Sequence, residues 1–150
     1  MLKIRLKSVM MLMLSVSLII GATLIAGCVR DETTTPETST QIIKDITPQE
    51  AFTLIQNNQN NPELVILDVR TPEEFTGGYI GSAVNIDFYS ETFRDELANL
   101  DKNKTYLIYC RGGTRGRSTL DITTELDFEE AYNMSGGMLR WVEEEFPTVK

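Results

Sequence analysis

The residue of this sequence best placed for nucleophilic chemistry is Cys110. It follows the apolar run 106–109 and opens the stretch Cys-Arg-Gly-Gly-Thr-Arg, which leads into a helical pattern. Two glycines allow a tight turn whose backbone N–H groups point inward, and a helix N-terminus adds partial positive charge. Five basic residues and no acidic residue lie within 102–120. Together these features favour a thiolate at Cys110 with an anion bound beside it.

A structural interpretation of Cys110 stands beside the functional one. A cysteine after an apolar strand is often a small, buried core residue. The Gly112–Gly113 pair and the charges of Arg111 and Arg115 favour the functional interpretation, because they turn the loop into a cradle for an anion.

The composition excludes several other chemistries. The chain has 150 residues, two cysteines and no histidine, with 14 basic and 22 acidic residues and a net charge of −8. Without histidine there is no Ser-His or Cys-His pair and no histidine metal ligand, and two cysteines cannot form a cysteine-rich zinc site. The length allows one domain, and the acidic balance predicts no nucleic-acid partner.

The first 27 residues have the pattern of an export signal. A basic segment, 3–7, precedes an apolar stretch, 9–26, which runs into Ile25-Ala26-Gly27-Cys28. This tetrapeptide resembles the lipobox of bacterial lipoproteins, which implies that 1–27 is removed as a signal peptide and that Cys28 carries a lipid. The alternative is an uncleaved transmembrane anchor, since about 18 to 20 apolar residues span a bilayer. Both interpretations predict a membrane-attached protein of the cell envelope that faces outside the cytoplasm.

A tether is expected between the signal and the folded domain. The segment 30–41 contains no apolar residue, so burial cannot offset the entropy lost on ordering it. We therefore expect residues 28–41 to be a lipidated N-terminus and flexible tether, and residues 42–150 to be the folded domain.

Strand and helix patterns alternate along this domain. Strands are expected over 42–46, 64–67, 84–86, 106–109 and 131–134, and helices after Thr47, after Thr71, over 90–100, from the Cys110 loop to 126, and after Gly137. Both threonines open a Thr-Pro-x-Glu sequence, which has the spacing of a capping box with proline at the first helical position. The alternation predicts an α/β fold with a central, mainly parallel sheet flanked by helices. Sites in such sheets lie at the carboxyl ends of strands, where Cys110 is expected.

Four segments of the domain together resemble the rhodanese family of single-domain sulfurtransferases. In chain order they are Asp68 to Phe75, Gly78 to Ile86, Cys110 to Arg115, which is similar to the six-residue active loop C-x-x-G-x-R, and Asn133 to Trp141. The similarity runs from about Ile42 to the C-terminus. It implies a rhodanese-like fold for residues 42–150.

The resemblance also implies a mechanism and a site. Cys110 would be the nucleophile that takes a sulfane sulfur from a small anionic donor, such as thiosulfate or polysulfide, and becomes a persulfide. Backbone N–H groups would surround the terminal sulfur, and they belong to Arg111, Gly112, Gly113, Thr114 and Arg115. The two arginines would attract the donor. A thiol or cyanide would then accept the sulfur, without a cofactor or metal.

Three positions depart from the family pattern. Tyr79 stands where histidine is usual, Gly116 where serine is common at the start of a helix, and Asp127 where glycine is common at its end. We expect the first change to affect packing rather than chemistry and the second to loosen the end of the loop. Aspartate tolerates the left-handed turn expected at the third position better than most residues do.

The remaining motif residues have structural interpretations. Asp68, Arg70 and Glu74 are expected to form a charge network rather than to act as catalysts. The Gly136–Gly137 pair is expected to shape a turn, and Trp141 to fill the core.

Two other functions remain open. Phosphatases and arsenate reductases have related architectures, but their loops resemble C-x-x-x-x-x-R, whereas four residues separate Cys110 from Arg115 here. The other alternative is a non-catalytic rhodanese-fold module that binds a partner or senses sulfur, and the retained Cys110 argues against it. A sulfur-transfer assay distinguishes the module from the enzyme.

Overall fold

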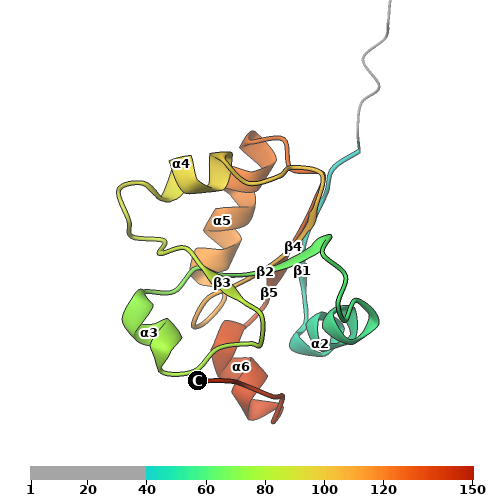
Figure 1. Cartoon of the computed structure of the whole chain (residues 1–150), viewed down its shortest axis with the longest axis vertical. Helices are drawn as coiled ribbons and strands as arrows, with labels where there is room; N and C mark the ends of the chain where they lie inside the picture. The colour runs from blue at the N-terminus through green and yellow to red at the C-terminus, as the bar shows by residue number, and fades with distance from the viewer. Residues whose placement is uncertain (1–39) are drawn as a thin grey trace, which may run out of the picture. The chain divides into compact units, whose positions relative to one another are not determined.

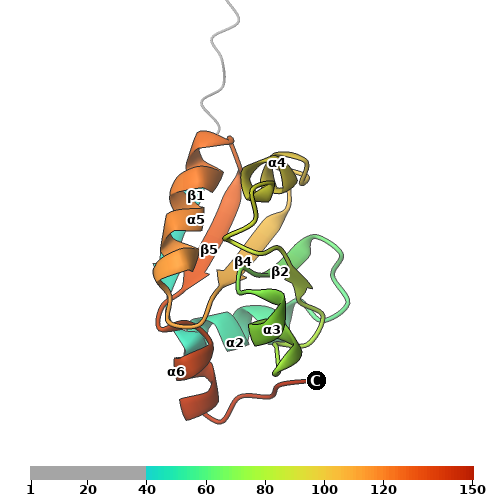
Figure 2. The same cartoon turned by 90° about the vertical axis from the view of Figure 1, so that its left-hand side faces the viewer.

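The computed structural model describes residues 40–150, in which one five-stranded sheet has helices on both faces (Figures 1 and 2). The strands are β1 (Ile42–Ile46), β2 (Leu64–Asp68), β3 (Val84–Asn85), β4 (Thr105–Tyr109) and β5 (Glu130–Met134). The helices are α2 (Pro48–Asn57), α3 (Pro72–Thr76), α4 (Phe93–Ala98), α5 (Thr114–Glu125) and α6 (Gly137–Glu143). The strand order is β1-β5-β4-β2-β3, and every strand pairing is parallel. The α/β prediction is therefore confirmed.

The central strand β4 is buried on both sides. Its side chains alternate between two cores, as those of any strand do. Tyr106 and Ile108 belong to the core under α4 and α5, whereas Leu107 and Tyr109 belong to the core against α2 and α6. All four residues are at most 1% exposed. The continuous apolar run in the sequence is thus that of a strand covered on both faces.

Both Thr-Pro-x-Glu sequences form the predicted capping boxes. At the start of α2, the Thr47 side chain accepts from the Glu50 N–H, and the Glu50 carboxylate accepts from the Thr47 N–H at 2.7 Å. Thr71 and Glu74 make the same pair of bonds at the start of α3. Each box satisfies backbone amides that a helix start leaves without intrahelical acceptors.

The helix expected over 90–100 is shorter in the structure, where α4 covers only Phe93–Ala98. Before it, the Ser90 hydroxyl accepts from the Thr92 N–H at 3.2 Å and forms a turn. After it, the Lys102 ammonium donates to the carbonyl oxygens of Leu97, Ala98 and Leu100. Side chains thus bond the backbone at both ends of the segment and replace helical hydrogen bonds there.

The predictions for residues 1–27 and for Cys28 lie outside the described residues, as does nearly all of the expected tether. Its last residue, Gln41, donates from its side chain to the Phe128 carbonyl oxygen at 3.0 Å. Contacts with the domain therefore begin one residue before the expected boundary. Within residues 40–150, no helix combines the length and apolar character needed to cross a membrane.

Candidate active site

Cys110 directly follows β4, at the carboxyl ends of the parallel strands. The loop after β4 leads into α5 (Figure 2). Its side chain lies on the same face as Ile108 and belongs to the core under α4 and α5. The residue is only 1% exposed. The Gly113 N–H donates to the Cys110 Sγ at 3.1 Å. The thiol is therefore both packed against the core and bonded by its own loop.

The loop carries backbone N–H groups that no described residue uses. The amides of Arg111, Gly112 and residues 114–116 donate to no acceptor within residues 40–150. The first bond of α5 runs from the Arg117 N–H to the Gly113 carbonyl oxygen at 2.9 Å, and the helix has no side-chain cap. Successive free amides at a helix start form a concavity that binds anions.

A left-handed glycine allows α6 to lie directly on this loop. Gly137 has a φ of 55°, and a Cβ at this position would collide with the Cys110 carbonyl oxygen. That oxygen accepts from the Met138 N–H at 2.8 Å, and the Arg111 carbonyl oxygen accepts from the Leu139 N–H at 3.0 Å. The start of α6 thus holds the reactive loop through backbone contacts, in agreement with the turn predicted here.

Arg115, at the end of the loop, is held by Glu74 at the start of α3. Its two terminal nitrogens donate to the two carboxylate oxygens at 2.7 and 2.9 Å, which is bidentate geometry. These hydrogen bonds hold the pKa of Glu74 at about 2 and raise the pKa of Arg115. Glu74 therefore balances much of the positive charge of Arg115, which the resemblance implies would attract the donor.

Arg111 is the exposed cation of the loop, and it forms no ion pair with any residue in the described part of the chain. Arg70 differs, because it is buried and its Nη2 donates to Asp68 at 2.6 Å and to the Gly78 carbonyl oxygen at 2.8 Å. Asp68 and Arg70 thus form the structural pair that the sequence predicts. Glu74, the third member of the predicted network, is bonded to the reactive loop instead.

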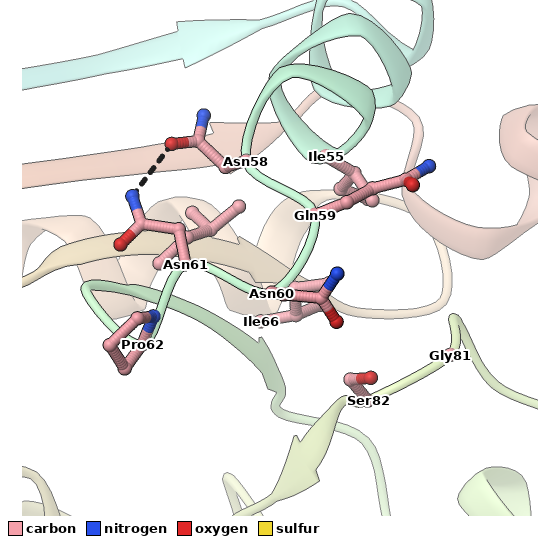
Figure 3. Close-up of a pocket in the computed structure, with 10 residues that line it drawn as sticks. Ile55, Asn58, Gln59, Asn60, Asn61, Pro62, Ile66, Gly81 and Ser82 are labelled. Atoms are coloured by element: carbon pink, nitrogen blue, oxygen red, sulfur yellow. Dashed lines mark hydrogen bonds between the residues drawn. The ribbon is translucent and has the colours of Figure 1, made fainter.

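A cavity of about 280 Å³ lies beside the loop, and its lining consists of Arg70, Glu74, Arg111, Met138, Leu139 and Val142. A larger cavity of about 460 Å³ lies at the turn between α2 and β2 (Figure 3). Its lining includes four amide side chains and no charged group. Because the strands are parallel, the start of β2 lies at the amino ends of the strands and the end of β4 lies at their carboxyl ends. Of these two cavities, only the smaller one therefore borders the Cys110 loop, through Arg111, and Cys110 itself does not line it.

The fold and the loop geometry agree with the comparison to known families. The model of the family described as the rhodanese-like domain matches residues 51–144, which is well over half of the chain. The chain belongs to the rhodanese-like domain family. The matched segment contains both Glu74 and the Cys110 loop. Among residues 40–150, no group of three or more His, Cys, Asp or Glu side chains is placed to hold a metal ion.

Relatives of this rhodanese-like domain carry different names. A mitochondrial protein of Schizosaccharomyces pombe, provisionally named a thiosulfate sulfurtransferase, is 26% identical over 117 residues, which cover 69% of this chain and 82% of that protein. A tRNA uridine(34) hydroxylase of Teredinibacter turnerae is 31% identical over 91 residues, which are 57% of this chain but only 28% of that protein.

Solved structures of rhodanese-like proteins have the same fold. A rhodanese-related protein from Thermoplasma volcanium is 25% identical, with a TM-score of 0.61 over 71% of this chain and 97% of that one. A rhodanese-like domain protein from Staphylococcus aureus is 34% identical, with a TM-score of 0.56 over 66% of this chain and 91% of that one.

Two departures from the rhodanese pattern have the structural roles expected of them. Tyr79 stacks on Phe75 with ring centroids 4.1 Å apart and exchanges two backbone hydrogen bonds of 2.9 Å with Val149. Asp127 has a φ of 60°, the left-handed conformation that glycine more often supplies at the end of a helix. Tyr79 therefore packs α3 and the C-terminal segment together.

The third departure has a different consequence from the one expected. The space beside Gly116 is filled rather than loose, because a Cβ there would collide with the Asn133 side-chain oxygen. Asn133 is 2% exposed, and its amide nitrogen donates to Asp45 at 2.6 Å. Its oxygen is buried without a hydrogen-bond partner among the described residues. Asn133 thus occupies the volume that a side chain at position 116 would need.

Sequence reasoning missed part of this site. It assigns Glu74 a structural role only, since its partner Arg115 lies 41 residues away and no local signal connects them. It also gives no role to Leu139 and Val142, which line the cavity beside the loop. Their i, i+3 spacing marks an apolar face of α6 distinct from the face of buried Trp141, and that spacing is the signal to look for.

Proposed function

We propose that this rhodanese-like domain is a sulfurtransferase whose Cys110 carries sulfane sulfur from a small anionic donor to a thiol or cyanide acceptor. The observation that carries the proposal is the set of amides in residues 111, 112 and 114–116 that donate to no acceptor within residues 40–150, next to a thiol that accepts from Gly113. A persulfide adds a negatively charged sulfur, which such amides can bind. The name of the Schizosaccharomyces pombe relative supports the same class of reaction.

The proposed transfer has two balanced steps. With thiosulfate as donor, the Cys110 thiolate attacks the outer sulfur, a new S–S bond forms, and sulfite leaves with the electron pair of the broken S–S bond. The Cys110 persulfide keeps one negative charge. Cyanide or a thiolate then attacks the terminal sulfur and leaves as thiocyanate or as a new persulfide, which restores the Cys110 thiolate. Neither step uses a cofactor.

The loop residues have separate roles in this proposal. The backbone amides of Arg111, Gly112, Thr114 and Arg115 bind the terminal sulfur, and the Gly113 amide bonds the Cys110 Sγ itself. Exposed Arg111 attracts the anionic donor, since its charge is not balanced by an ion pair within residues 40–150. The Arg115 side chain is bonded to Glu74 and so positions the end of the loop.

A binding or sulfur-sensing module is the second candidate. The burial of Cys110, 1% exposed within an apolar core, favours it. A module of this kind would bind a partner without forming a persulfide, or would hold a persulfide without passing it on.

The test uses the full-length chain, purified in detergent, beside its Cys110→Ser variant. Each is reduced, incubated with thiosulfate or polysulfide and mapped by peptide mass, and then treated with cyanide or a thiol. We expect one added sulfur on the wild-type peptide that contains Cys110, its loss on adding acceptor, and neither change in the variant. A persulfide that no acceptor removes supports the sensing module, and the absence of any adduct contradicts sulfur transfer.

We further propose that Cys28 carries a lipid, which attaches the domain to a membrane of the cell envelope on the side away from the cytoplasm. The support is the sequence of residues 1–28 alone. Replacing Cys28 by Ala is expected to leave an uncleaved precursor that carries no lipid, whereas Cys110→Ala leaves processing unchanged. Unchanged processing and acylation in the Cys28 variant would contradict the proposal.

A further inference from the structure

The larger cavity, of about 460 Å³, lies at the amino ends of the strands, away from Cys110. Its lining comes from the end of α2, the turn 58–62 that follows it, the start of β2, and the turn at Gly81 and Ser82 that precedes β3 (Figure 3). Small-molecule sites in proteins have volumes of about 300 to 1,000 Å³. The cavity is therefore large enough for a ligand, and the proposed sulfur transfer does not use it.

The lining combines amide and apolar side chains and is uncharged. Residues 58–61 all carry amides, and the apolar part includes Ile55, Leu64 and Ile66. Lys104, whose ammonium donates to the Pro62 carbonyl oxygen at 3.1 Å, does not line the cavity. A charged ligand would lose hydration here and meet no opposite charge in the lining. The lining thus favours an uncharged ligand.

Hydrogen bonds hold the turn after α2 but leave the Asn60 side chain free. The Asn58 amide nitrogen donates to the Leu54 carbonyl oxygen at 2.9 Å, and the Asn61 amide nitrogen donates to the Asn58 side-chain oxygen at 2.9 Å (Figure 3). Within residues 40–150, the Asn60 amide and the Ser82 hydroxyl bond no other residue. The cavity therefore offers an amide and a hydroxyl that can each donate and accept.

Asn60 and Ser82 also share an unfavourable backbone conformation. Both have a φ of 64°, which is left-handed. Four non-glycine residues among 40–150 have a positive φ, and these two line the same cavity. Glycine would adopt this conformation without a steric penalty, which serine in particular does not escape. Residues held in this way are concentrated at ligand sites. The two polar side chains are thus present where the backbone alone would favour glycine.

We propose that this cavity binds a neutral saccharide of one or two rings. A sugar ring carries hydroxyl groups around its rim, each of which donates and accepts, and C–H groups on its faces. The rim matches the amides and the Ser82 hydroxyl, and a C–H face matches Ile55, Leu64 and Ile66. A cavity of about 150 Å³ can hold benzene, so 460 Å³ has room for about two sugar rings.

The test is calorimetric titration of the full-length chain, purified in a detergent without a sugar headgroup. The probes are cellobiose and N,N′-diacetylchitobiose, which are neutral, and chitobiose at slightly acidic pH, where its amino groups are protonated. A neutral, acetylated dialanine amide has amides but no hydroxyl groups. We expect the two neutral sugars to bind with Kd values of about 1 mM, and the charged sugar and the peptide to bind at least about tenfold more weakly.

The variant is Asn60→Gly with Ser82→Gly, which removes both free polar groups and keeps a backbone that glycine adopts readily. The matched control is Asp127→Gly, because Asp127 has a φ of 60° but does not line the cavity. We expect the double variant to raise the Kd of the neutral sugars by about tenfold and the control to leave it unchanged. Urea unfolding of each variant confirms that the fold is retained.

Four outcomes overturn the proposal. They are the absence of binding by either neutral sugar, equal binding of the charged sugar, equal binding of the peptide, and an unchanged Kd in a folded double variant. An equal loss of binding in the Asp127 control also overturns it, because the effect then does not come from this cavity. Binding here does not require sulfur transfer, so none of these results depends on whether Cys110 carries sulfur.

Discussion

The helices of this domain begin in two different ways. At α2 and α3, a threonine side chain and a glutamate side chain together close a capping box. At α5 and α6, the first turn follows a left-handed glycine, Gly113 or Gly136, and no side chain caps it. The amides of α6 bond the carbonyl oxygens of the reactive loop, whereas the first three amides of α5 have no acceptor within residues 40–150.

The two kinds of helix start differ in whether a side chain occupies the amides of the first turn. A side chain at the N-cap accepts a hydrogen bond from the second or third amide of the helix, which is where an anion would bind. Gly113 leaves that place empty at α5, beside Cys110. It also lets the loop approach α6 closely, since a Cβ at Gly113 would lie 2.8 Å from the Gly136 nitrogen. The uncapped helix starts thus depend on tertiary contacts, and the capped ones on local sequence.

The largest effect is expected from filling the left-handed glycine at the start of α5. Gly113→Ala places a Cβ against the Gly136 backbone at a φ of 96°, and we expect it to lower the free energy of unfolding by about 3 kcal/mol. Gly112→Ala is the control, because nothing lies within 4 Å of its Cβ, and its effect should stay within about 1 kcal/mol. Urea unfolding of both variants checks this. Equal losses would show that the loop does not depend on the close approach.

A smaller effect is expected from a side chain inside the first turn of α5. Gly116→Ser restores the residue common in the family but collides with Asn133, so we expect a loss of about 2 kcal/mol. Adding Asn133→Ala removes the collision and should recover about 1 kcal/mol, measured as the coupling in a double-mutant cycle. Additive losses would mean that Asn133 does not fill the place of the missing serine.

The capped helix starts are also the part of the fold that the sequence predicts best. Thr47 and Thr71 open the same four-residue pattern, and the apolar run 106–109 has the length of a buried strand, so these elements depend on neighbours in the chain. The pairing of Glu74 with Arg115 and the contact of Gly116 with Asn133 depend on strand order and on helix placement. No periodicity or motif contains that information. The Cys110 loop was predictable because its glycines and arginines are contiguous.

The two capping glutamates should differ when each is removed. Glu74→Ala breaks the cap of α3 and leaves the Arg115 guanidinium, 14% exposed, without its partner, for which we expect a loss of about 2 kcal/mol in unfolding free energy. Glu50→Ala breaks only a cap on the surface, so its loss should be smaller. Urea unfolding of the two variants measures the difference. A larger loss for Glu50→Ala would contradict the link between Glu74 and the reactive loop.

The pH dependence of stability gives the finest comparison between the same two residues. The hydrogen bonds from Arg115 hold the pKa of Glu74 at about 2, below its ordinary value of 4.5. A lowered pKa in the folded state stabilises the fold above pH 4.5, and that stabilisation is lost as the pH falls toward 2. Glu74→Gln should therefore flatten the decline in unfolding free energy over this range. Glu50→Gln should flatten it less. The pKa of Glu50 is lowered mainly by the hydrogen bonds of the Thr47 cap, and its carboxylate is exposed to solvent. Equal flattening by the two variants would show that the bond to Arg115 lowers the pKa of Glu74 no further than the cap does. The stability lost when Glu74 is protonated should be smaller than the loss in Glu74→Ala, because a protonated Glu74 keeps part of its hydrogen bonding.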